Sequence, residues 1–195
     1  KTQNQKIIKT FKTNLAVYAK HCLKIIDKQG KLITLEFNDA QKKLDDMINE
    51  QFSHQGRVRM LILKSRQTGI STYCQARGFW KTATNQNLNA VVVSHLNEST
   101  KAIFNMVKNF YDNLPHPLVT PELKESTSNS MAFAHGSRWR IATARTGEVG
   151  RGWTTNYLHG SEVAFYPNAD IIPGLLQTVP EENSEILLES TANGA

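Results

Sequence analysis

A short polar loop joins an apolar run to a helix-compatible segment in the first half of the chain. The apolar run is Val58–Leu63, the loop is Lys64–Ile70, and residues 71–84 are compatible with a helix. A continuous apolar run of this length is typical of a strand buried within a sheet. A buried strand that leads through such a loop into a helix favours a sheet of parallel strands with helices packed on it.

The rest of the chain continues this alternation of strands and helices. Asn38 and Gln41 form the pattern of a capping box, which predicts a helix over residues 39–52, and Asn97 is expected to cap another helix. Further expected elements are strands at residues 90–93, 154–160 and 185–189, a hairpin at 131–143, a helix after Pro167 and a connector at 113–130. The sequence therefore predicts an α/β fold with a largely parallel central sheet flanked by helices. In such sheets, ligands bind at the carboxyl ends of the strands.

The positive charge of the chain is concentrated at its start. The chain of 195 residues has a formal net charge of +6, and residues 1–31 hold eight lysines against one acidic residue, Asp27. The remaining residues are therefore close to neutral as a group. A basic excess indicates a polyanionic partner such as nucleic acid. We expect residues 1–36 to form a basic N-terminal segment, either a loose arm or a marginal helix, ahead of a domain at residues 37–195.

Cysteine content and hydropathy argue against two classes of protein. Cys22 and Cys74 are too few for a disulfide framework, and their spacing matches no zinc motif. No apolar run approaches the roughly 20 residues that span a bilayer, and the lysine-rich start lacks the apolar core of a signal peptide. The sequence predicts a soluble, intracellular protein with no membrane contact.

The loop Lys64–Ile70 has the layout of a phosphate-binding loop. The usual pattern is G-x4-G-K-[ST]; here Gly69 and Ser71 match it, while Lys64 and Ile70 replace the first glycine and the lysine. Backbone amides at a helix N-terminus attract phosphate whatever the side chains are, and Lys64 and Arg66 add positive charge. Ser71 has the position and the chemistry to hold Mg²⁺ through its hydroxyl oxygen. A basic turn that binds nothing is the alternative interpretation.

Two polar segments follow other expected strands. Glu162 comes after the strand at residues 154–160, where a nucleotide hydrolase needs a carboxylate to orient the attacking water. Ser161 stands where a second carboxylate is usual, and its hydroxyl can hydrogen-bond to a metal-bound water without adding charge. Residues 190–193 follow the strand at 185–189 and carry hydroxyl and amide groups able to sense a phosphate. Each segment is also compatible with an ordinary solvated turn.

In order and spacing, four segments resemble motifs of the ATPase domain of phage terminase large subunits. Residues 64–71 resemble the variant Walker A loop of this family, in which the lysine can come first, as in its lambda-like branch. Residues 157–162 resemble the Walker B strand with its catalytic glutamate. Residues 190–193 resemble the motif that couples hydrolysis to DNA movement, and residues 37–41 are similar to the adenine-reading motif.

The resemblance implies a RecA-like P-loop core that binds ATP and Mg²⁺ and hydrolyses ATP. The nucleotide-binding residues that it implies are Gln41, Lys64, Ser65, Arg66, Gln67, Thr68, Gly69, Ile70, Ser71 and Thr72. The residues that it implies for coupling are Ser190, Thr191, Ala192 and Asn193. Gln41 also has the helix-cap interpretation, and the two roles compete for one side chain.

The catalytic and metal roles follow from the same resemblance. Glu162 would orient the attacking water, and Ser71 and Ser161 would hold the metal ion and its waters. Because Ile70 replaces the usual loop lysine, we expect Lys64 to bind the phosphates and Arg66 to stabilise charge in the transition state.

As a terminase, the chain would power the packaging of viral double-stranded DNA into the procapsid, in the cytoplasm of the infected host cell. Its partners would be the DNA, the small terminase subunit, the portal protein and further copies of itself in a ring. The family's nuclease would lie beyond Ala195, so we expect no DNA cleavage by this fragment, and weak turnover unless ring neighbours complete the site. Candidate DNA-backbone contacts are Arg138, Arg140, Arg145 and Arg151, with plain solvated charge as the alternative.

Two other functions compete with this interpretation. One is a helicase-like, nucleic-acid-dependent ATPase, in which an Asp-Glu pair is expected where Ser161 and Glu162 stand. The other is a non-enzymatic DNA-binding module that acts through the lysine-rich segment.

Overall fold

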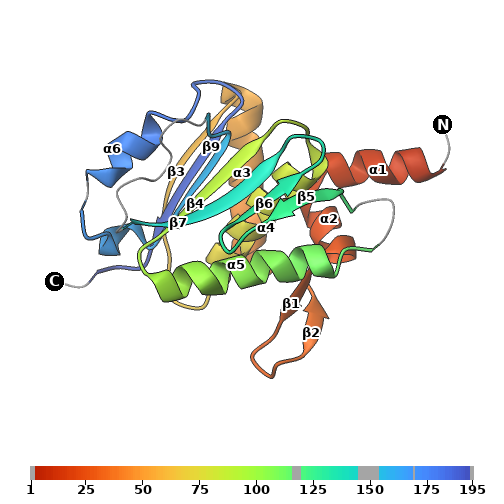
Figure 1. Cartoon of the computed structure of the whole chain (residues 1–195), viewed down its shortest axis with the longest axis horizontal. Helices are drawn as coiled ribbons and strands as arrows, with labels where there is room; N and C mark the ends of the chain where they lie inside the picture. Colours follow the sequence, from red (N-terminus) through yellow and green to blue (C-terminus); the bar gives the residue numbers. More distant parts are fainter. Residues whose placement is uncertain (1–2, 116–119, 145–153, 169, 194–195) are drawn as a thin grey trace.

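The centre of the fold is a seven-stranded sheet. Figure 1 shows how the helices are arranged around it. The computed structural model describes residues 3–115, 120–144, 154–168 and 170–193. In these residues the helices are α1 (Gln3–Thr13), α2 (Leu15–Cys22), α3 (Asp39–Gln55), α4 (Ile70–Thr84), α5 (Asn97–Asp112) and α6 (Ile171–Leu176), with a 3₁₀ turn η2 (Val163–Phe165). The strands are β1 (Lys24–Ile26), β2 (Leu32–Thr34), β3 (Val58–Leu63), β4 (Asn89–Ser94), β5 (Leu123–Ser126), β6 (Ser130–Phe133), β7 (Arg138–Thr143), β8 (Tyr157–Ser161) and β9 (Glu185–Ser190).

Most strands of the large sheet run parallel. Its order is β3-β9-β8-β4-β7-β6-β5. The first five strands in this order are parallel to their neighbours. Strand β6 pairs antiparallel with both β7 and β5. The register places Leu63 beside Ser190, Glu189 beside Ser161, and Ser161 beside Ser94. The carboxyl ends of β3, β9, β8 and β4 therefore meet at one edge of the sheet, where ligands bind in folds of this class. The predicted α/β fold with a largely parallel sheet is confirmed.

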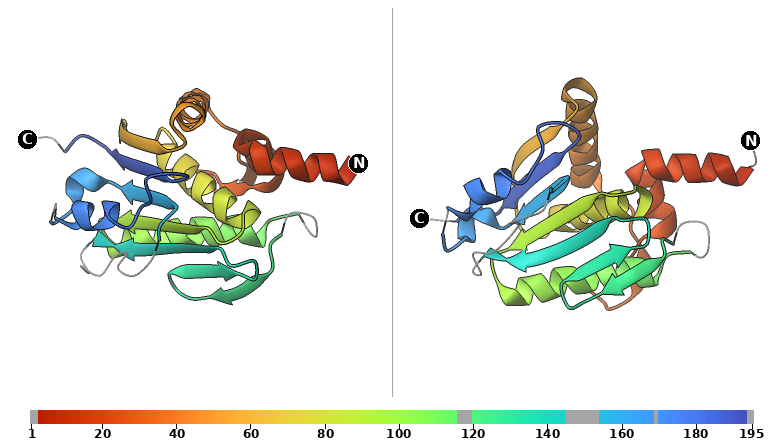
Figure 2. Two further views of the ribbon diagram at one scale, coloured as in Figure 1. Left: turned by 90° about the horizontal axis from the view of Figure 1, so that it is seen from above. Right: turned by 45° about the horizontal axis from the view of Figure 1, so that its top comes forward.

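Apolar side chains fill both faces of the sheet. In β4, Val92 belongs to a large buried cluster with Phe79 of α4, whereas Val93 belongs to a smaller cluster with Leu175 of α6. Because successive side chains of a strand point to opposite faces, α4 and α5 cover one face and α6 lies against the other (Figure 2). This two-sided burial explains the apolar run at residues 90–93.

The described residues cover only one face of strand β3. Leu61 is 80% exposed and Leu63 is 79% exposed, although Val58 is fully buried. The expectation of burial for the whole run 58–63 is therefore wrong for its outer face. The reason is that β3 forms an edge of the described sheet, and α6 covers the strands farther in.

Residues 15–35 fold against the large core rather than forming a loose arm. Asn14 caps α2 by accepting a hydrogen bond of 2.9 Å from the amide of Val17. Tyr18 and Leu23 are fully buried in the same cluster as Phe79 of α4. The expectation of a loose arm is wrong here because the apolar side chains between the lysines bury against α4, and the alternative of a helix is confirmed for α1 and α2.

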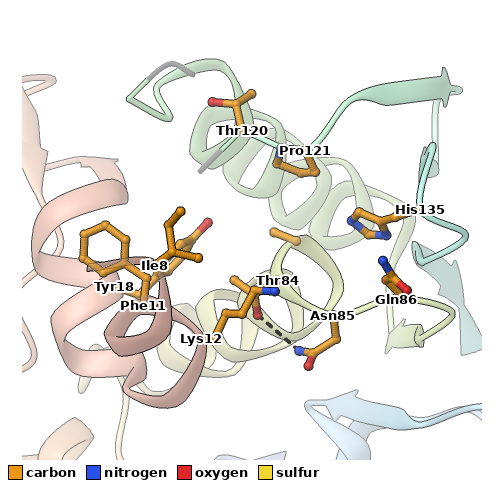
Figure 3. A pocket seen from close by; sticks show the side chains of 11 residues that line it. Ile8, Phe11, Lys12, Tyr18, Thr84, Asn85, Gln86, Thr120, Pro121 and His135 are labelled. Carbon is orange, nitrogen blue, oxygen red and sulfur yellow. Dashed lines mark hydrogen bonds between the residues drawn. The ribbon is translucent and has the colours of Figure 1, made fainter. Parts of the chain in front are cut away.

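A cavity of about 190 Å³ opens where α1 meets the turn after α4. Figure 3 shows Ile8, Phe11, Tyr18, Thr84 and Asn85 among the side chains that line it. Because Thr84 and Asn85 precede β4, this cavity lies near the amino end of that strand. It is therefore separate from the carboxyl edge described below.

Two elements differ from the sequence-based expectations. Helix α5 begins at Asn97 with Leu96 as its N-cap, because Asn97 Oδ1 instead accepts a hydrogen bond of 2.8 Å from Thr143 Oγ1 at the end of β7. The connector expected at residues 113–130 contains β5, which is stabilised by pairing with β6 rather than by a local pattern. Among the described helices, none combines the length and the apolar character needed to cross a bilayer.

Candidate active site

The loop between β3 and α4 places a helix N-terminus at the carboxyl edge of the sheet. The amide of Lys64 donates to the carbonyl of Ser190 at 3.0 Å, so the loop leaves the sheet beside β9. Gly69 precedes α4 in a left-handed conformation with φ 76°. A Cβ at Gly69 would lie 2.8 Å from Gln41 Nε2, so the backbone angle and the limited space both favour glycine. The first amides of a helix have no intrahelical partner, and residues Ile70–Thr72 at the start of α4 therefore suit an anion.

Lys64 reaches into a cluster of carboxylates instead of solvent. Its side chain is 9% exposed, and its ammonium lies 2.8 Å from Glu162 Oε1 and 3.1 Å from Glu189 Oε2. Burial by itself lowers the pKa of a lysine, but these two carboxylates outweigh burial and raise the pKa of Lys64. Arg66 lies on the exposed part of the loop. Lys64 is therefore a charged group held at the centre of the carboxyl edge.

Glu162 is held as a carboxylate at the end of β8. Its backbone is left-handed, with φ 56° and ψ 49°, which is uncommon for a residue other than glycine. Its Oε2 accepts hydrogen bonds from the amide and the hydroxyl of Thr191, both at 3.0 Å. Burial opposes ionisation, but the bonds from Lys64 and Thr191 lower the pKa of Glu162 below its usual value. The fold thus brings together Lys64, Glu162 and Thr191, three residues that the sequence analysis took from separate segments.

Glu189 of β9 also belongs to this cluster, although it lies in none of the predicted motifs. Its side chain is fully buried, and its Oε1 accepts hydrogen bonds of 2.9 Å from both Ser71 Oγ and Ser161 Oγ. Burial opposes ionisation, yet His159 at 3.5 Å and Lys64 lower the pKa of Glu189 to about 2. The two serines predicted to hold a metal therefore share one carboxylate oxygen. A glutamate within an otherwise apolar strand is the signal that marks this residue, because a buried carboxylate needs partners.

Gln41 ties α3 to the loop. Its side-chain oxygen accepts from the amide of Asn38 at 3.0 Å, as in a capping box, and its Nε2 donates to the carbonyl of Gly69 at 2.8 Å. The residue is 3% exposed. The helix-cap interpretation is confirmed. The adenine contact stays a prediction, and it would use the second Nε2 hydrogen or the second acceptor position of Oε1.

Other predicted residues surround the cluster. Thr68 Oγ1 donates to the carbonyl of Ser65 at 3.1 Å, which closes a turn within the loop. Gln67 accepts a hydrogen bond of 2.8 Å from Lys28, in the turn between β1 and β2, so the basic N-terminal segment reaches the loop. Asn193 Nδ2 donates to a backbone carbonyl of η2 at 3.1 Å.

Two of the four candidate DNA contacts lie in the described part of the chain. Arg138 and Arg140 belong to β7, whereas Arg145 and Arg151 lie outside the described residues. Ala192 of the predicted coupling motif is exposed after β9.

Two hollows meet at Lys64. The first has a volume of about 320 Å³ and is lined by Lys64, Arg66, Gln67, His95, Glu162, Phe165 and Thr191. The second, of about 590 Å³, lies between α3 and β3, and Ala40, Lys43 and Thr68 are among its lining residues. His95 is a further lining residue outside the predicted motifs; the signal that marks it is its position directly after β4, at the same edge of the sheet. Hollows of this size suit a small-molecule ligand.

Comparisons with known proteins bear on the fold of the whole chain. No protein-family model matches the sequence, and no curated protein matches it. Among solved structures, the large terminase of bacteriophage HK97 matches with a TM-score of 0.72 over 92% of this chain, at 13% sequence identity. An ATPase-domain mutant of the large terminase of Thermus phage P74-26 matches with a TM-score of 0.64 over 82% of this chain and 66% of its own, at 16% identity. The chain has the fold of a large terminase ATPase domain.

The terminase fold confirms the RecA-like core that the motifs implied. The large terminase of a thermophilic bacteriophage, solved in complex with ADP, also has this fold, with a TM-score of 0.58 and 12% identity over 79% of the chain. This chain covers 37% of the HK97 terminase and 38% of the ADP-bound terminase. The likeness therefore concerns one part of those longer proteins.

Proposed function

We propose that this chain is the ATP-hydrolysing motor domain of a phage terminase large subunit, which powers the packaging of viral double-stranded DNA. The observation that carries the proposal is the cluster of Lys64, Glu162 and Thr191 at the carboxyl edge of a sheet with the terminase fold. A cation beside the loop would bind phosphates, and a nearby carboxylate would orient the attacking water. The hydroxyl that donates to this carboxylate would couple the site to the segment after β9. A terminase from a thermophilic bacteriophage with this fold was solved with ADP, which supports nucleotide binding by this chain.

The triphosphate would lie against the first amides of α4, with Lys64 donating to its oxygens. In the structure, the Lys64 ammonium donates to Glu162 Oε1 at 2.8 Å. Phosphate oxygens would compete for Lys64, and its transfer to them would release Glu162 Oε1 for a water molecule. The larger hollow, lined by Ala40 and Lys43 of α3, is the side on which the base would lie.

Glu162 would then orient the attacking water. Its Oε2 is already fixed by Thr191, so the released Oε1 has a defined direction in which to accept a hydrogen bond from water. The water oxygen would form a bond to the γ-phosphorus as the bond to the bridging oxygen breaks, with ADP as the leaving group, and the proton that the water loses would pass to a phosphate oxygen. Arg66 would stabilise the charge that develops on the phosphate oxygens. Thr191 and Asn193 would pass the loss of the γ-phosphate to the DNA-binding surface.

The residues present fit Mg²⁺. Ser71, Ser161 and Glu189 offer hydroxyl and carboxylate oxygens, which this ion prefers. In the part of the chain that the structure describes, no group of three or more His, Cys, Asp or Glu residues could hold a metal by itself. An ion that keeps most of its ligands as water and phosphate suits such a site. When bound, Mg²⁺ would neutralise negative charge on the phosphates, with Ser71 holding the ion and Ser161 a bound water.

The proposal extends to the assembly. The partners would be double-stranded DNA, the small terminase subunit, the portal protein and further copies of the chain in a ring, within the cytoplasm of the infected host cell. ATP hydrolysis is assigned to residues 37–195 and DNA cleavage to none of them. DNA would be held through its phosphates, so its affinity would fall as salt rises.

The experiment is to replace Glu162 by Gln and to measure nucleotide binding and ATP hydrolysis separately, in the full motor with DNA. We expect the Glu162→Gln protein to bind ATP within about 3-fold of the wild type and to lose at least about 100-fold in hydrolysis. Glu50→Gln, an exposed change on α3, is the matched control and should keep both. Equal hydrolysis by Glu162→Gln and wild type would contradict the role of Glu162, and failure of the wild type to bind ATP would contradict the proposal as a whole.

A further inference from the structure

The pairing of β8 with β9 sets a carboxylate beside the serine that occupies the usual position of a metal-site aspartate. Ser161 and Glu189 are register partners on these parallel strands. Neighbouring strands lie about 4.8 Å apart, so a glutamate on one strand reaches the side chain of its partner on the next. The Ser161 hydroxyl donates to Glu189 Oε1 at 2.9 Å. The charge that Ser161 lacks is therefore present one strand away.

Glu189 also accepts a hydrogen bond from Ser71, the second serine predicted to hold the metal. Ser71, in the first turn of α4, donates its hydroxyl proton to the same Oε1 at 2.9 Å. A hydroxyl that donates its proton to a carboxylate keeps its oxygen lone pairs for a cation. Glu189 thus fixes the orientation of Ser71 and Ser161 together.

At short range the cluster consists of two carboxylates, the ammonium of Lys64 and the imidazole of His159. Lys64 is the cation shared by Glu162 and Glu189, at 2.8 and 3.1 Å. If Lys64 turns to phosphate, Glu189 keeps the two serine hydroxyls and His159, whose Nε2 lies at 3.5 Å. Glu189 Oε2 is buried and accepts no hydrogen bond of good geometry from the described residues. A buried carboxylate in this state needs a compensating cation.

We propose that Glu189 supplies from β9 the carboxylate that organises Mg²⁺ at this site, in place of the aspartate that β8 lacks at Ser161. It would do so through the Ser71 hydroxyl and through metal-bound water. This inference rests on the proposed function, since it takes the loop after β3 as the site of the triphosphate. It makes Glu189 a positioning residue for the metal, a role distinct from that of Glu162 at the attacking water.

The test is a titration of Mn²⁺, observed by electron paramagnetic resonance, into the protein saturated with a non-hydrolysable ATP analogue. We expect Glu189→Gln to weaken Mn²⁺ binding by about 10- to 100-fold, the usual cost of removing a group that supports metal ligands. Nucleotide affinity measured in EDTA should change much less. Glu50→Gln, exposed on α3, should bind Mn²⁺ as the wild type does.

A rescue experiment separates this role from a general structural one. In the Glu189→Gln background, Ser161→Asp returns a carboxylate to β8, and we expect it to restore most of the Mn²⁺ affinity. If Glu189→Gln fails to fold, as judged by circular dichroism, Glu189→Asp takes its place, because it keeps the charge but withdraws it by one methylene and should still weaken Mn²⁺ binding. Unchanged Mn²⁺ affinity in the folded Glu189 variant would overturn the inference while leaving the proposed function intact. A wild type that binds no nucleotide in EDTA or with metal would instead contradict the proposed function.

Discussion

Strand β9 presents two buried glutamates to α4, Glu185 at its amino end and Glu189 near its carboxyl end. Arg77 of α4 binds Glu185 through two bonds of 2.7 and 3.0 Å, and Lys81 adds a third at 2.7 Å. Glu189 instead accepts bonds from two serine hydroxyls and shares Lys64 with a second carboxylate. The same residue type on the same face of one strand thus has two different surroundings.

The difference lies in the balance of charge and in the origin of the cation. At the amino end, two cations from the body of α4 satisfy Glu185, and Arg77 also binds Asp45 at 3.2 Å. At the carboxyl end, the ammonium is that of one lysine from a loop, which faces two carboxylates, and His159 lies 3.5 Å from one of them. A buried carboxylate with enough rigid cations stabilises a fold, whereas one with too few retains a capacity to bind cations. We therefore expect changes at the amino end to cost stability and changes at the carboxyl end to cost ligand binding and turnover.

The largest expected effect on stability is that of Arg77→Met. It leaves Glu185 and Asp45 in the interior with less compensation, so the free energy of unfolding should fall by about 3 to 5 kcal/mol. Urea denaturation followed by circular dichroism measures this. Arg57→Met, which removes an exposed ion pair with Glu181, is the control and should cost less than about 1 kcal/mol. If Arg77→Met lowered the free energy of unfolding as little as the control does, the amino and carboxyl ends of β9 would not differ in the way described.

Acid should lower the free energy of unfolding by protonating Glu185 at the amino end of β9, over a defined pH window. The pKa of Glu185 in the folded protein is lowered to about 2, because Arg77 and Lys81 outweigh the opposing effect of burial. A lowered pKa gives stability that is present above the usual glutamate pKa and is lost as the pH falls from there toward 2. The contribution is of the order of 3 kcal/mol. Unfolding measured between pH 6 and about pH 2.5 should show this loss.

The matched variant for the acid experiment is Glu185→Gln, which has no carboxylate to protonate at this position. Its stability should depend less steeply on pH over the same window than that of the wild type. Identical slopes would mean that Glu185 does not contribute to the acid response.

At the carboxyl end, Lys64→Met should lower nucleotide affinity by about 10- to 100-fold, as expected for the loss of charge-assisted bonds to phosphate. Arg66→Met should lower affinity less, because Arg66 is assigned to the transition state. Binding of a fluorescent ATP analogue measures both. A larger loss of affinity for Arg66→Met than for Lys64→Met would reverse the two assignments.

A small effect on stability is expected for Thr191→Val, well below that of Arg77→Met. It removes one of the bonds to Glu162 Oε2 and keeps the one from the Thr191 amide, so unfolding should change by about 1 kcal/mol. The rate of ATP hydrolysis should fall by a larger factor than the one to which this change in stability corresponds. The reason is that the Glu162 carboxylate is held less firmly in one direction. A parallel measurement of steady-state hydrolysis and denaturation tests this. Reduced stability with full activity would place Thr191 among the structural residues.

Local patterns predicted the elements that carry the site. The loop after Val58–Leu63 and the polar segments after two other strands were sufficient to predict that Lys64, Glu162 and Thr191 belong together. This works because the carboxyl ends of parallel strands meet at one edge whatever the details of packing. The helix cap at Gln41 was visible in the sequence for a similar reason, since a capping box depends on residues three apart.

Other features depend on contacts between distant segments and were missed. To predict that Glu189 pairs with Ser161 and with Ser71, one must know which strands neighbour β9 and which face of β9 carries Glu189. The sequence of residues 185–189 does not reveal either. Burial of Tyr18 depends on its contact with α4, which a lysine-rich segment does not reveal by itself. Strand β5 depends on its partner β6 in the same way.

A crystal structure of the protein with a non-hydrolysable ATP analogue and Mg²⁺ would test directly whether the carboxyl edge is a nucleotide site. We expect the phosphates to lie against the amides of residues 69–72. We also expect Lys64 Nζ to have moved from Glu162 Oε1 to a phosphate oxygen, and Glu189 still to accept the hydrogen bond from the Ser71 hydroxyl beside the metal. A nucleotide bound elsewhere, or Lys64 still paired with Glu162 in the presence of a bound triphosphate, would contradict these expectations.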